Sequence, residues 1–455
     1  MTPAAIALNR FGLGARPDEP VPDDPRGWLL QQIAAPGEPP PMWRGLPGTE
    51  ALVAEEAASR RALREAAEAD RPALRQARNQ QTRDIYQNAV RARADSALAA
   101  AAPLVERLVH FWANHFALSI EKPEVQALAG AYEAEAIRPR VLGRFENLLL
   151  AAERHPAMLL YLDQHASVGP GSPAMRRSAH PRGLNENLAR EIMELHTLGV
   201  RSGYMQEDVT EFARALTGWG AAINADTRYQ QAGPDPGFVF RPQLHEPGAR
   251  TVLGRRYEDQ GAQQAAAVLH DLATMPATAA HLCAKLARHF VADAPPPALV
   301  ERMTGVWLRT RGDLAAVTRA LVESPEAWAP APAKFKTPWE WAVSAQRALG
   351  RRQSGAPSAA AALFTQLGQP VWRPGSPAGW DDIAASWAAP DALVRRVETA
   401  QRLAAQTDAA LDARALAPRV LPGSVADETT QALSRAESPA TALALLLVAP
   451  DFLRR

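Results

Sequence analysis

Residues 183–220 read GLNENLAREIMELHTLGVRSGYMQEDVTEFARALTGWG, a pattern that predicts two short helices separated by a turn. Asn185 is a suitable N-cap for the first helix, and Gly199 stands where helices commonly end on a left-handed glycine. Carboxylates, amides, arginines and a histidine lie between the apolar positions at a density that packing alone does not explain. We therefore expect this stretch to hold the working part of the chain.

The first of these helices offers a pair of carboxylates. Glu191 and Glu194 share one face of the predicted helix, and Arg190 stands beside that face. His196 is expected to point inward or to lie at a boundary. Two carboxylates one turn apart repel each other unless a cation, a shared proton or an arginine compensates them. An arginine partner indicates an internal ion-pair network, whereas a hard cation or a shared proton indicates a catalytic site, and the spacing leaves both interpretations open.

Four other polar residues are further candidates. His115 lies in FWANHF on an apolar face, where a histidine is either part of the core or part of the site. Asp163 precedes a glycine-rich loop, and it either binds a ligand or fixes that loop. His245 lies at a tight turn, where a functional role and a turn-stabilising role are both open. Glu186 falls in the first turn of its helix, where a negative charge suits the helix dipole.

The rest of the sequence is typical of a mainly α protein. Ala, Leu, Arg and Glu dominate, and β-branched runs are scarce. Residues 51–100 are charged, rich in alanine and low in bulky apolar groups, which predicts an exposed helical hairpin, broken near Pro72, that projects from the body. FVF and TVLG around a Pro-Gly turn predict a small β-hairpin insertion over residues 238–254. We expect residues 1–455 to form one large helical domain that contains both features.

Composition narrows the partners and the compartment. The 455 residues include 50 Lys plus Arg and 49 Asp plus Glu, so the formal net charge is +1. This balance gives no reason to expect nucleic acid, and a small molecule or a protein is the expected partner. Cys283 is the only cysteine, and HLCAKLARHF predicts an apolar helix that buries it. Neither a membrane span nor a signal peptide is recognised, so a cytoplasmic location is the default expectation.

Common catalytic signatures are missing from the sequence. It contains no G-x-x-x-x-G-K-[ST] phosphate loop, H-E-x-x-H zinc helix, EF-hand loop or G-x-S-x-G nucleophile elbow. Glu194 and His196 stand two residues apart rather than three, so the Glu-x-x-His pattern of helical di-iron proteins is also absent. No short motif therefore assigns a reaction.

A set of longer motifs follows in a recognisable order: RFGLGARP, FWANHF, AGAYEAEAIRP, HPAMLLYLD, SVGPGS, NENLAREIMELHTLGV and HEPGARTVLG. Together they resemble the large bacterial domain-of-unknown-function 1800 family, from Arg10 to the closing DFLRR. The resemblance implies no activity, cofactor or substrate, and it implies envelope-associated work for many relatives. Ala113 departs from it, because relatives often have a histidine there. Positions that match the family motifs are Asn114, His115, Asp163, Asn185, Glu186, Asn187, Arg190, Glu191, Glu194, His196 and His245.

Two functions are compatible with these residues. The first is a hydrolase that uses paired carboxylates and a histidine as acid and base groups, with a divalent metal as a candidate cofactor. Its catalytic candidates are Glu191, Glu194, His196, Arg190 and His115, and its candidate metal ligands are Asp163, Glu186 and His245. We expect a cleft with His115, Asp163 and the 165–183 loop opposite the helix. The second is a non-catalytic binding or assembly protein, in which residues 51–100 and the Trp-rich loop 366–381 are contact surfaces.

Overall fold

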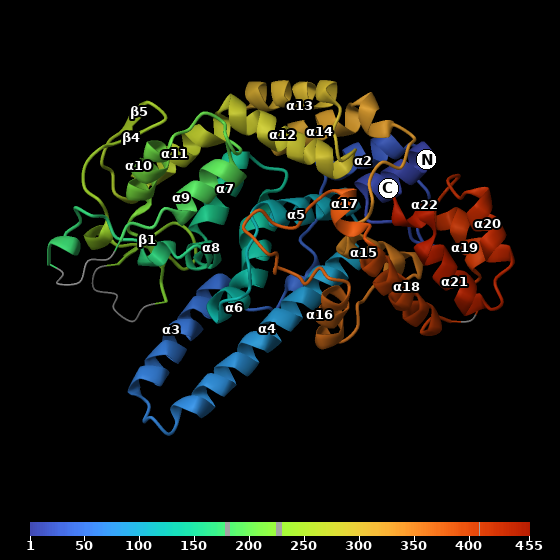
Figure 1. Cartoon of the computed structure of the whole chain (residues 1–455), viewed down its shortest axis with the longest axis horizontal. Coiled ribbons are helices and arrows are strands. Elements are labelled where there is room, and N and C mark those ends of the chain that lie inside the picture. The colour runs from blue at the N-terminus through green and yellow to red at the C-terminus, as the bar shows by residue number, and fades with distance from the viewer. Residues whose placement is uncertain (178–182, 224–229, 409) are drawn as a thin grey trace.

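Helices make up most of the structure, which confirms the mainly α prediction (Figure 1). The computed structural model describes residues 1–177, 183–223, 230–408 and 410–455. The α-helices of the N-terminal half are α1 (Pro3–Ala5), α2 (Pro25–Ala34), α3 (Thr49–Glu65), α4 (Arg71–Ala99), α5 (Pro103–His115), α6 (Pro123–Ala131), α7 (Phe145–Arg154), α8 (Pro156–Tyr161), α9 (Asn187–Glu191) and α10 (Gln206–Leu216).

The C-terminal half continues with α11 (Ala262–Thr274), α12 (Pro276–Phe290), α13 (Pro297–Thr310), α14 (Leu314–Glu323), α15 (Pro338–Ala348), α16 (Pro357–Gln366), α17 (Ala384–Trp387), α18 (Pro390–Ala405), α19 (Ala413–Val420), α20 (Asp427–Ser434), α21 (Pro439–Val448) and α22 (Pro450–Leu453). Short π-helical segments are η1 (Ile6–Phe11), η3 (Tyr132–Ile137) and η7 (Ile192–His196). The 3₁₀ turns are η2 (Pro41–Trp43), η4 (Arg138–Arg140), η5 (Gln164–Ala166), η6 (Met175–Arg177), η8 (Pro242–Leu244) and η9 (Pro325–Trp328).

Prolines start many of these helices, which explains how a chain with 39 prolines can be mainly helical. A proline in the first turn loses no hydrogen bond, because that N–H has no partner within the helix. The residue before a proline also avoids the helical conformation. Met275 shows the result: it ends α11 in an extended conformation (ψ 143°), and Pro276 starts α12 directly after it. One short junction therefore sets the direction of α12.

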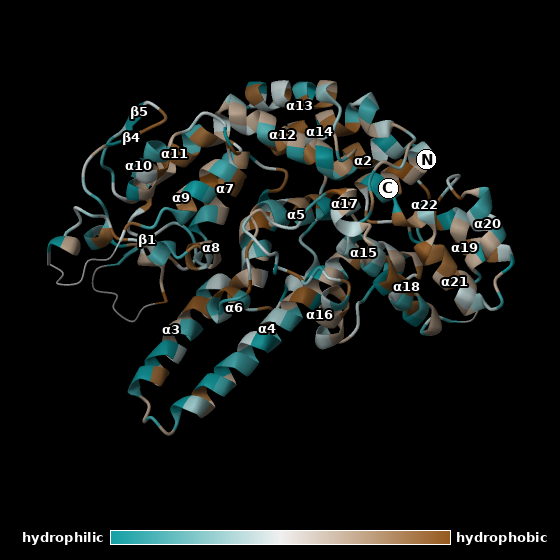
Figure 2. Cartoon of the chain, in the orientation of Figure 1, coloured by the Kyte–Doolittle hydropathy of each residue, from teal (hydrophilic) through white to brown (hydrophobic). Residues whose placement is uncertain are grey.

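The predicted helical hairpin is formed by α3 and α4, which project from the body and meet at residues 66–70 (Figure 1). Its outer part is mainly hydrophilic (Figure 2). From Thr82 onward, however, α4 contains many buried residues and packs against α6 and α16. A Cβ added at Gly130 of α6 would lie 2.4 Å from the Cβ of Ala89. The alanines therefore serve close helix packing, and only the outer half of residues 51–100 projects.

The β structure is small and antiparallel, but the predicted pairing of FVF with TVLG is wrong. β3 (Phe238–Phe240) pairs with β1 (Trp219–Ala221) and β2 (Gln231–Ala232). β4 (Arg250–Val252) pairs with β5 (Arg255–Tyr257). The turn explains the second pairing, because Leu253 and Gly254 both have positive φ (51° and 74°), as a two-residue hairpin turn requires.

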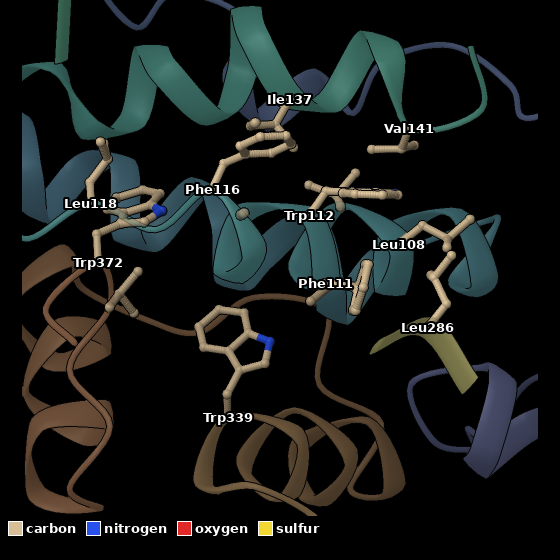
Figure 3. Close-up of a cluster of buried hydrophobic side chains, with 14 of the residues drawn as sticks. Leu108, Phe111, Trp112, Phe116, Leu118, Ile137, Val141, Leu286, Trp339 and Trp372 are labelled. Atoms are coloured by element: carbon tan, nitrogen blue, oxygen red, sulfur yellow. The ribbon is translucent and has the colours of Figure 1, made fainter. Parts of the chain in front are cut away.

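The helix α5 runs through the hydrophobic core (Figure 3). Trp112 and Phe116 lie toward Ile137, whereas Phe111 lies on another side of the helix, toward Leu286. The ring centroids of Trp112 and Phe145 are 5.6 Å apart. Because α5 is buried on nearly all sides, polar side chains at its C-terminal end are held in fixed positions.

Buried arginines join loops and a helix end that lie far apart in the chain. Arg347 donates to the backbone carbonyls of Gly14 and Leu98, and Arg16 donates to those of Leu98 and Gly350. A guanidinium group carries five donors, so one side chain satisfies several carbonyls that no regular structure pairs. In the parts of the chain that the structure describes, no helix is long and apolar enough to cross a membrane.

Candidate functional site

A cavity of about 400 Å³ lies between α5, α12, the start of α15 and the irregular segment 369–383. The 183–220 block reaches this cavity through Glu194, Leu195 and Val200 but does not form most of its wall. The ionisable side chains on the wall are Arg93, Arg107, His110, His115, Glu194, His281, Lys285, Arg288, His289, Glu340, Asp381 and Asp382. Ionisable groups gathered on an otherwise apolar concave wall make this cavity the candidate functional site.

The helix α12 supplies one polar face of the cavity. His281, Lys285 and His289 are spaced four residues apart, and Arg288 lies beside them, so they share one side of the helix. Cys283 is buried in the core, which confirms that part of the prediction. The sequence interpretation of HLCAKLARHF as simply apolar missed the polar face. The spacing H-x-x-x-K-x-x-R-H was the signal that could have revealed it.

His115 of α5 holds the amine of Lys285. The Nε2 atom of His115 lies 3.2 Å from the carbonyl oxygen of His196, which can only accept, so Nε2 carries the proton. Nδ1 therefore has a free lone pair, to which Lys285 Nζ donates at 3.0 Å. Burial, reinforced by the positive charge of Lys285, lowers the pKa of His115 well below its usual value. The ring stays neutral with both nitrogens engaged, and this geometry favours a positioning role over the predicted catalytic one.

Lys285 itself is a half-buried amine on the cavity wall. Burial lowers its pKa to about 8, although the carboxylate of Asp382 opposes the shift. An amine in this range is mostly protonated at neutral pH and can still release its proton. Lys285 is therefore the cation of the site that is best suited to proton exchange.

Asp382 and His289 form a second pair on the wall. Their Oδ2 and Nδ1 atoms are 2.6 Å apart. Burial alone would raise the pKa of Asp382, but His289 and Lys334 outweigh burial and hold that pKa far below its usual value. A carboxylate only accepts, so His289 carries its proton on Nδ1, and the buried Nε2 atom has no hydrogen-bond partner among the described residues. A carboxylate that sets the tautomer of a histidine in this way prepares Nε2 to accept a proton.

The segment that carries Asp382 is fixed to α5 by Asn114. The side chain of Asn114 accepts from the backbone N–H of Trp380 at 2.7 Å and donates to the carbonyl of Trp380 at 2.9 Å. Gly379 has a φ of 82°, and a Cβ there would lie 2.3 Å from the backbone oxygen of Asn114. Glycine is required for this close approach. The loop predicted as irregular over 366–381 is thereby part of the cavity wall.

Glu191 and Glu194, the predicted pair of carboxylates, lie in different surroundings. The ion-pair interpretation expected Arg190 between Glu191 and Glu194, but Arg190 lies 3.2 Å from Glu186 and 3.4 Å from Glu194. Glu191 is half-buried, has no ion pair among the described residues, and its pKa is raised mainly by burial. The π-helical segment η7 (Ile192–His196) departs from the 3.6-residue repeat on which the face assignment rested. Only Glu194 reaches the cavity wall, and its predicted catalytic role stays a prediction.

His196 points inward, as predicted, and packs behind His115, with 5.8 Å between the ring centroids. Its Nδ1 atom lies 2.7 Å from Oε1 of Glu153, but the two groups are not aligned for a hydrogen bond. Both side chains are buried, and neither lines the cavity. His196 thus belongs to a buried pair that supports the site from behind.

The three candidate metal ligands lie in separate local networks. Their partners include Lys122 Nζ for Asp163 (2.7 Å), Thr210 Oγ1 for Glu186 (2.7 Å) and the Thr217 carbonyl for His245 (2.8 Å). Within the described ranges, no three His, Cys, Asp or Glu side chains are arranged to hold a metal ion. Asp163 and residues 165–176 and 183 do not line the cavity, and residues 178–182 of the predicted loop lie outside the described residues. No step is therefore assigned to a metal.

The family model described as Protein of unknown function (DUF1800) matches residues 6–454. The chain belongs to this family. No curated protein and no solved structure matches it. The description of the DUF1800 family names no reaction. The roles of its motif residues therefore have to be inferred from the positions that they occupy in the structure.

Five of the DUF1800 motif residues fall into two groups according to their place in the structure. Asn114, His115 and Glu194 line the cavity, whereas Asp163 and His245 support loops elsewhere. Ala113, where the resemblance implies a histidine in many relatives, also lines the cavity. This departure therefore changes the cavity wall itself.

Proposed function

We propose that the protein is a hydrolase in which His289, oriented by Asp382, takes a proton from a water molecule. The observation that supports this proposal most directly is the 2.6 Å contact between Asp382 Oδ2 and His289 Nδ1 on the wall of a 400 Å³ cavity. The contact leaves Nε2 of His289 without a partner among the described residues, and because this atom is buried, the proposal requires that the water reach it from the cavity. A base needs such a free lone pair.

In this mechanism the proton of water moves to Nε2 of His289 while the water oxygen bonds to the electrophilic atom of the substrate. Asp382 stabilises the imidazolium that forms, and the imidazolium then gives the proton to the leaving group. The ammonium group of Lys285 stabilises negative charge that develops on the substrate, because a fixed cation acts strongly in a partly desolvated site. His115 positions that ammonium group.

The protonation states fit this division of roles near neutral pH. Burial lowers the pKa of His289, with Asp382 opposing the shift, so the ring is mainly neutral and able to accept a proton. Burial lowers the pKa of Lys285 to about 8, so the amine is mainly protonated. Glu194, at the edge of the cavity, is compensated by Arg190 and has no assigned step.

The test is a substrate screen with a matched control. Purified wild-type protein, His289→Gln and His270→Gln are assayed with chromogenic carboxyl, phosphate and sulfate esters. His270 is the control because its Nδ1 lies 2.7 Å from Glu146 in a pair of the same kind, away from the cavity. We expect His289→Gln to lose about 10²–10⁴-fold in turnover and His270→Gln to match the wild type. Wild-type turnover in a folded His289→Gln protein, checked by its melting temperature, would contradict the proposal.

A non-catalytic binding or assembly role is the second candidate. The observation that favours it is the outer half of the α3–α4 hairpin, which is largely exposed. Its base is held by Glu56, which contacts Arg60 and Arg78. Removing residues 62–74, beyond these pairs, should abolish capture of a protein partner if the arm is the contact surface. Unchanged capture by the shortened protein would count against this role.

A further inference from the structure

The chain uses arginine for almost every cation, so its few lysines are informative. Of 50 lysine and arginine residues, four are lysines. Lys122 binds the end of α8 and Asp163, Lys334 binds Asp293 and Asp382, and Lys336 lies over the ring of Phe452 in the core. These three have structural partners. Lys285 differs from them because its amine lies on a cavity wall and donates to a neutral histidine.

The charges on the cavity wall are unevenly compensated. Arg107 contacts Glu340, and Arg93 lies 2.8 Å from Glu133. Lys285 and Arg288, by contrast, have no carboxylate within 4.0 Å among the residues that the structure describes. The hydrogen bond of Arg288 is from Nε to the carbonyl oxygen of Asp293, at 3.2 Å. Two cations one turn apart on α12 thus have no carboxylate in direct contact beside the cavity.

Besides that of Glu340, the negative charge of the cavity wall comes from Glu194, Asp381 and Asp382. Glu194 is compensated by Arg190, and Asp382 by Lys334 and His289. Asp381 accepts from the hydroxyl of Ser386 and has no cation within 4.0 Å in the described part of the chain. Most of the negative charge on the wall is therefore already compensated, in contrast to Lys285 and Arg288.

We propose that Lys285 and Arg288 bind an anionic group of the substrate, a carboxylate, a phosphate or a sulfate. This inference rests on the proposed function, whose substrate class it names. The arginine fork suits two oxygens of such a group, and the lysine adds a point charge. Phe111, Leu118 and Ile383 on the wall reduce access of water, which strengthens the attraction. A bound anion would also favour the protonated amine and so raise the pKa of Lys285 from its value of about 8.

Binding of simple anions tests the proposal without a known substrate. Sodium acetate, phosphate and sulfate are titrated against sodium chloride of equal ionic strength, and the melting temperature is followed. Sulfate and phosphate stabilise most folded proteins by exclusion from their surfaces. The exposed Arg319→Gln variant therefore serves as the control, because its shift measures this general effect. The acetate arm distinguishes a planar carboxylate site from a site for tetrahedral anions.

We expect at least one anion to show saturable stabilisation in the wild type and in Arg319→Gln. In Lys285→Met and Arg288→Gln the affinity should fall by about tenfold or more, because each variant loses one charge-assisted contact. Equal stabilisation by all salts, or unchanged affinity in both variants, would overturn the proposal.

A second measurement uses the wild type alone, so it does not depend on the folding of Lys285→Met. Formaldehyde with cyanoborohydride methylates free amines, and four lysines can be followed individually by peptide mass spectrometry. The saturating anion should slow methylation of Lys285 and leave that of Lys122 unchanged. Equal slowing of both lysines, or of neither, would overturn the anion site.

The two proposals can fail separately. His289→Gln should bind the anion with wild-type affinity although it lacks turnover. Wild-type turnover in His289→Gln together with normal anion binding would remove the proposed reaction and keep the anion site. Loss of turnover in His289→Gln with no anion binding in the wild type would keep the proposed reaction and remove the anion site.

Discussion

The 183–220 block and the inner face of α12 contain similar residues in different electrostatic situations. In the block, one arginine lies between two glutamates, Glu186 and Glu194, and also contacts Gln206. On α12, Lys285 and Arg288 have no carboxylate partner among the described residues, and His289 has a buried Nε2 without a hydrogen-bond partner. Polar density is therefore a poor guide to a site. The balance of charges around each group indicates which region is available to a ligand.

The largest expected difference between the two regions is in turnover. Asp382→Asn removes the carboxylate that orients His289, and we expect a loss of about 10²–10⁴-fold in kcat/KM. Glu186→Gln removes a carboxylate of the block and should leave kcat/KM close to the wild-type value. Both variants are assayed on the substrate found in the screen. Equal losses in the two variants would remove the distinction between the regions.

The next effect concerns the buried pair behind the site. Glu153→Gln removes the buried carboxylate that lies 2.7 Å from Nδ1 of His196, and removing one partner of a buried polar pair costs about 1–3 kcal/mol. Urea denaturation of the variant and the wild type gives the change in the free energy of unfolding. A change below about 1 kcal/mol, the range of exposed pairs, would show that this pair does not hold the block against α5.

Acid stability should depend on histidines that burial keeps neutral. Burial lowers the pKa of His110 to about 4 and that of His155 to about 3, from 6.5. Below pH 6.5 the unfolded chain binds these protons and the folded chain does not, so stability falls as the pH falls toward 4. Each histidine contributes up to about 1.4 kcal/mol per pH unit. His155→Gln should reduce the measured slope by that amount, and an unchanged slope would contradict the assignment.

The pH dependence of kcat/KM should depend on residues of α12 and not on those of the 183–220 block. Activity should fall on the acid side below pH 6.5, where His289 gains a proton, and on the alkaline side near pH 8, where Lys285 loses one. Arg190→Met should leave both limbs in place because it touches neither group. The profile of kcat/KM against pH is measured for the two proteins. A shifted alkaline limb in Arg190→Met would link the block to the proton transfer.

The smallest expected effect is on stability in the block. Arg190 and its two glutamates are partly exposed, and such pairs contribute about 0–1 kcal/mol because solvent screens them. Arg190→Met should therefore change the free energy of unfolding by no more than that. A larger loss, measured by the same urea titration, would indicate that the network supports the packing of α9 against α10.

The sequence allowed the helical class and the buried Cys283 to be predicted, because local periodicity determines them. Glu194 lines the cavity, and its catalytic role stays a prediction. Asp382 could not be placed in this way. It lies in an irregular segment 93 residues from His289, and only tertiary contacts such as that between Asn114 and Trp380 bring the two together. The π-helical turn at η7 likewise depends on packing and changed the expected direction of side chains in the block.

The exposed tip between α3 and α4 has a practical consequence. Residues 67–70 are solvent-exposed and lie at the far end of a projecting hairpin (Figure 1). Loop tips of this kind tolerate inserted sequence, since the flanking helices already hold the two ends close together. A fluorescent label, an affinity tag or a whole reporter module placed there would leave the cavity undisturbed and provide a handle for immobilising the protein in a known orientation.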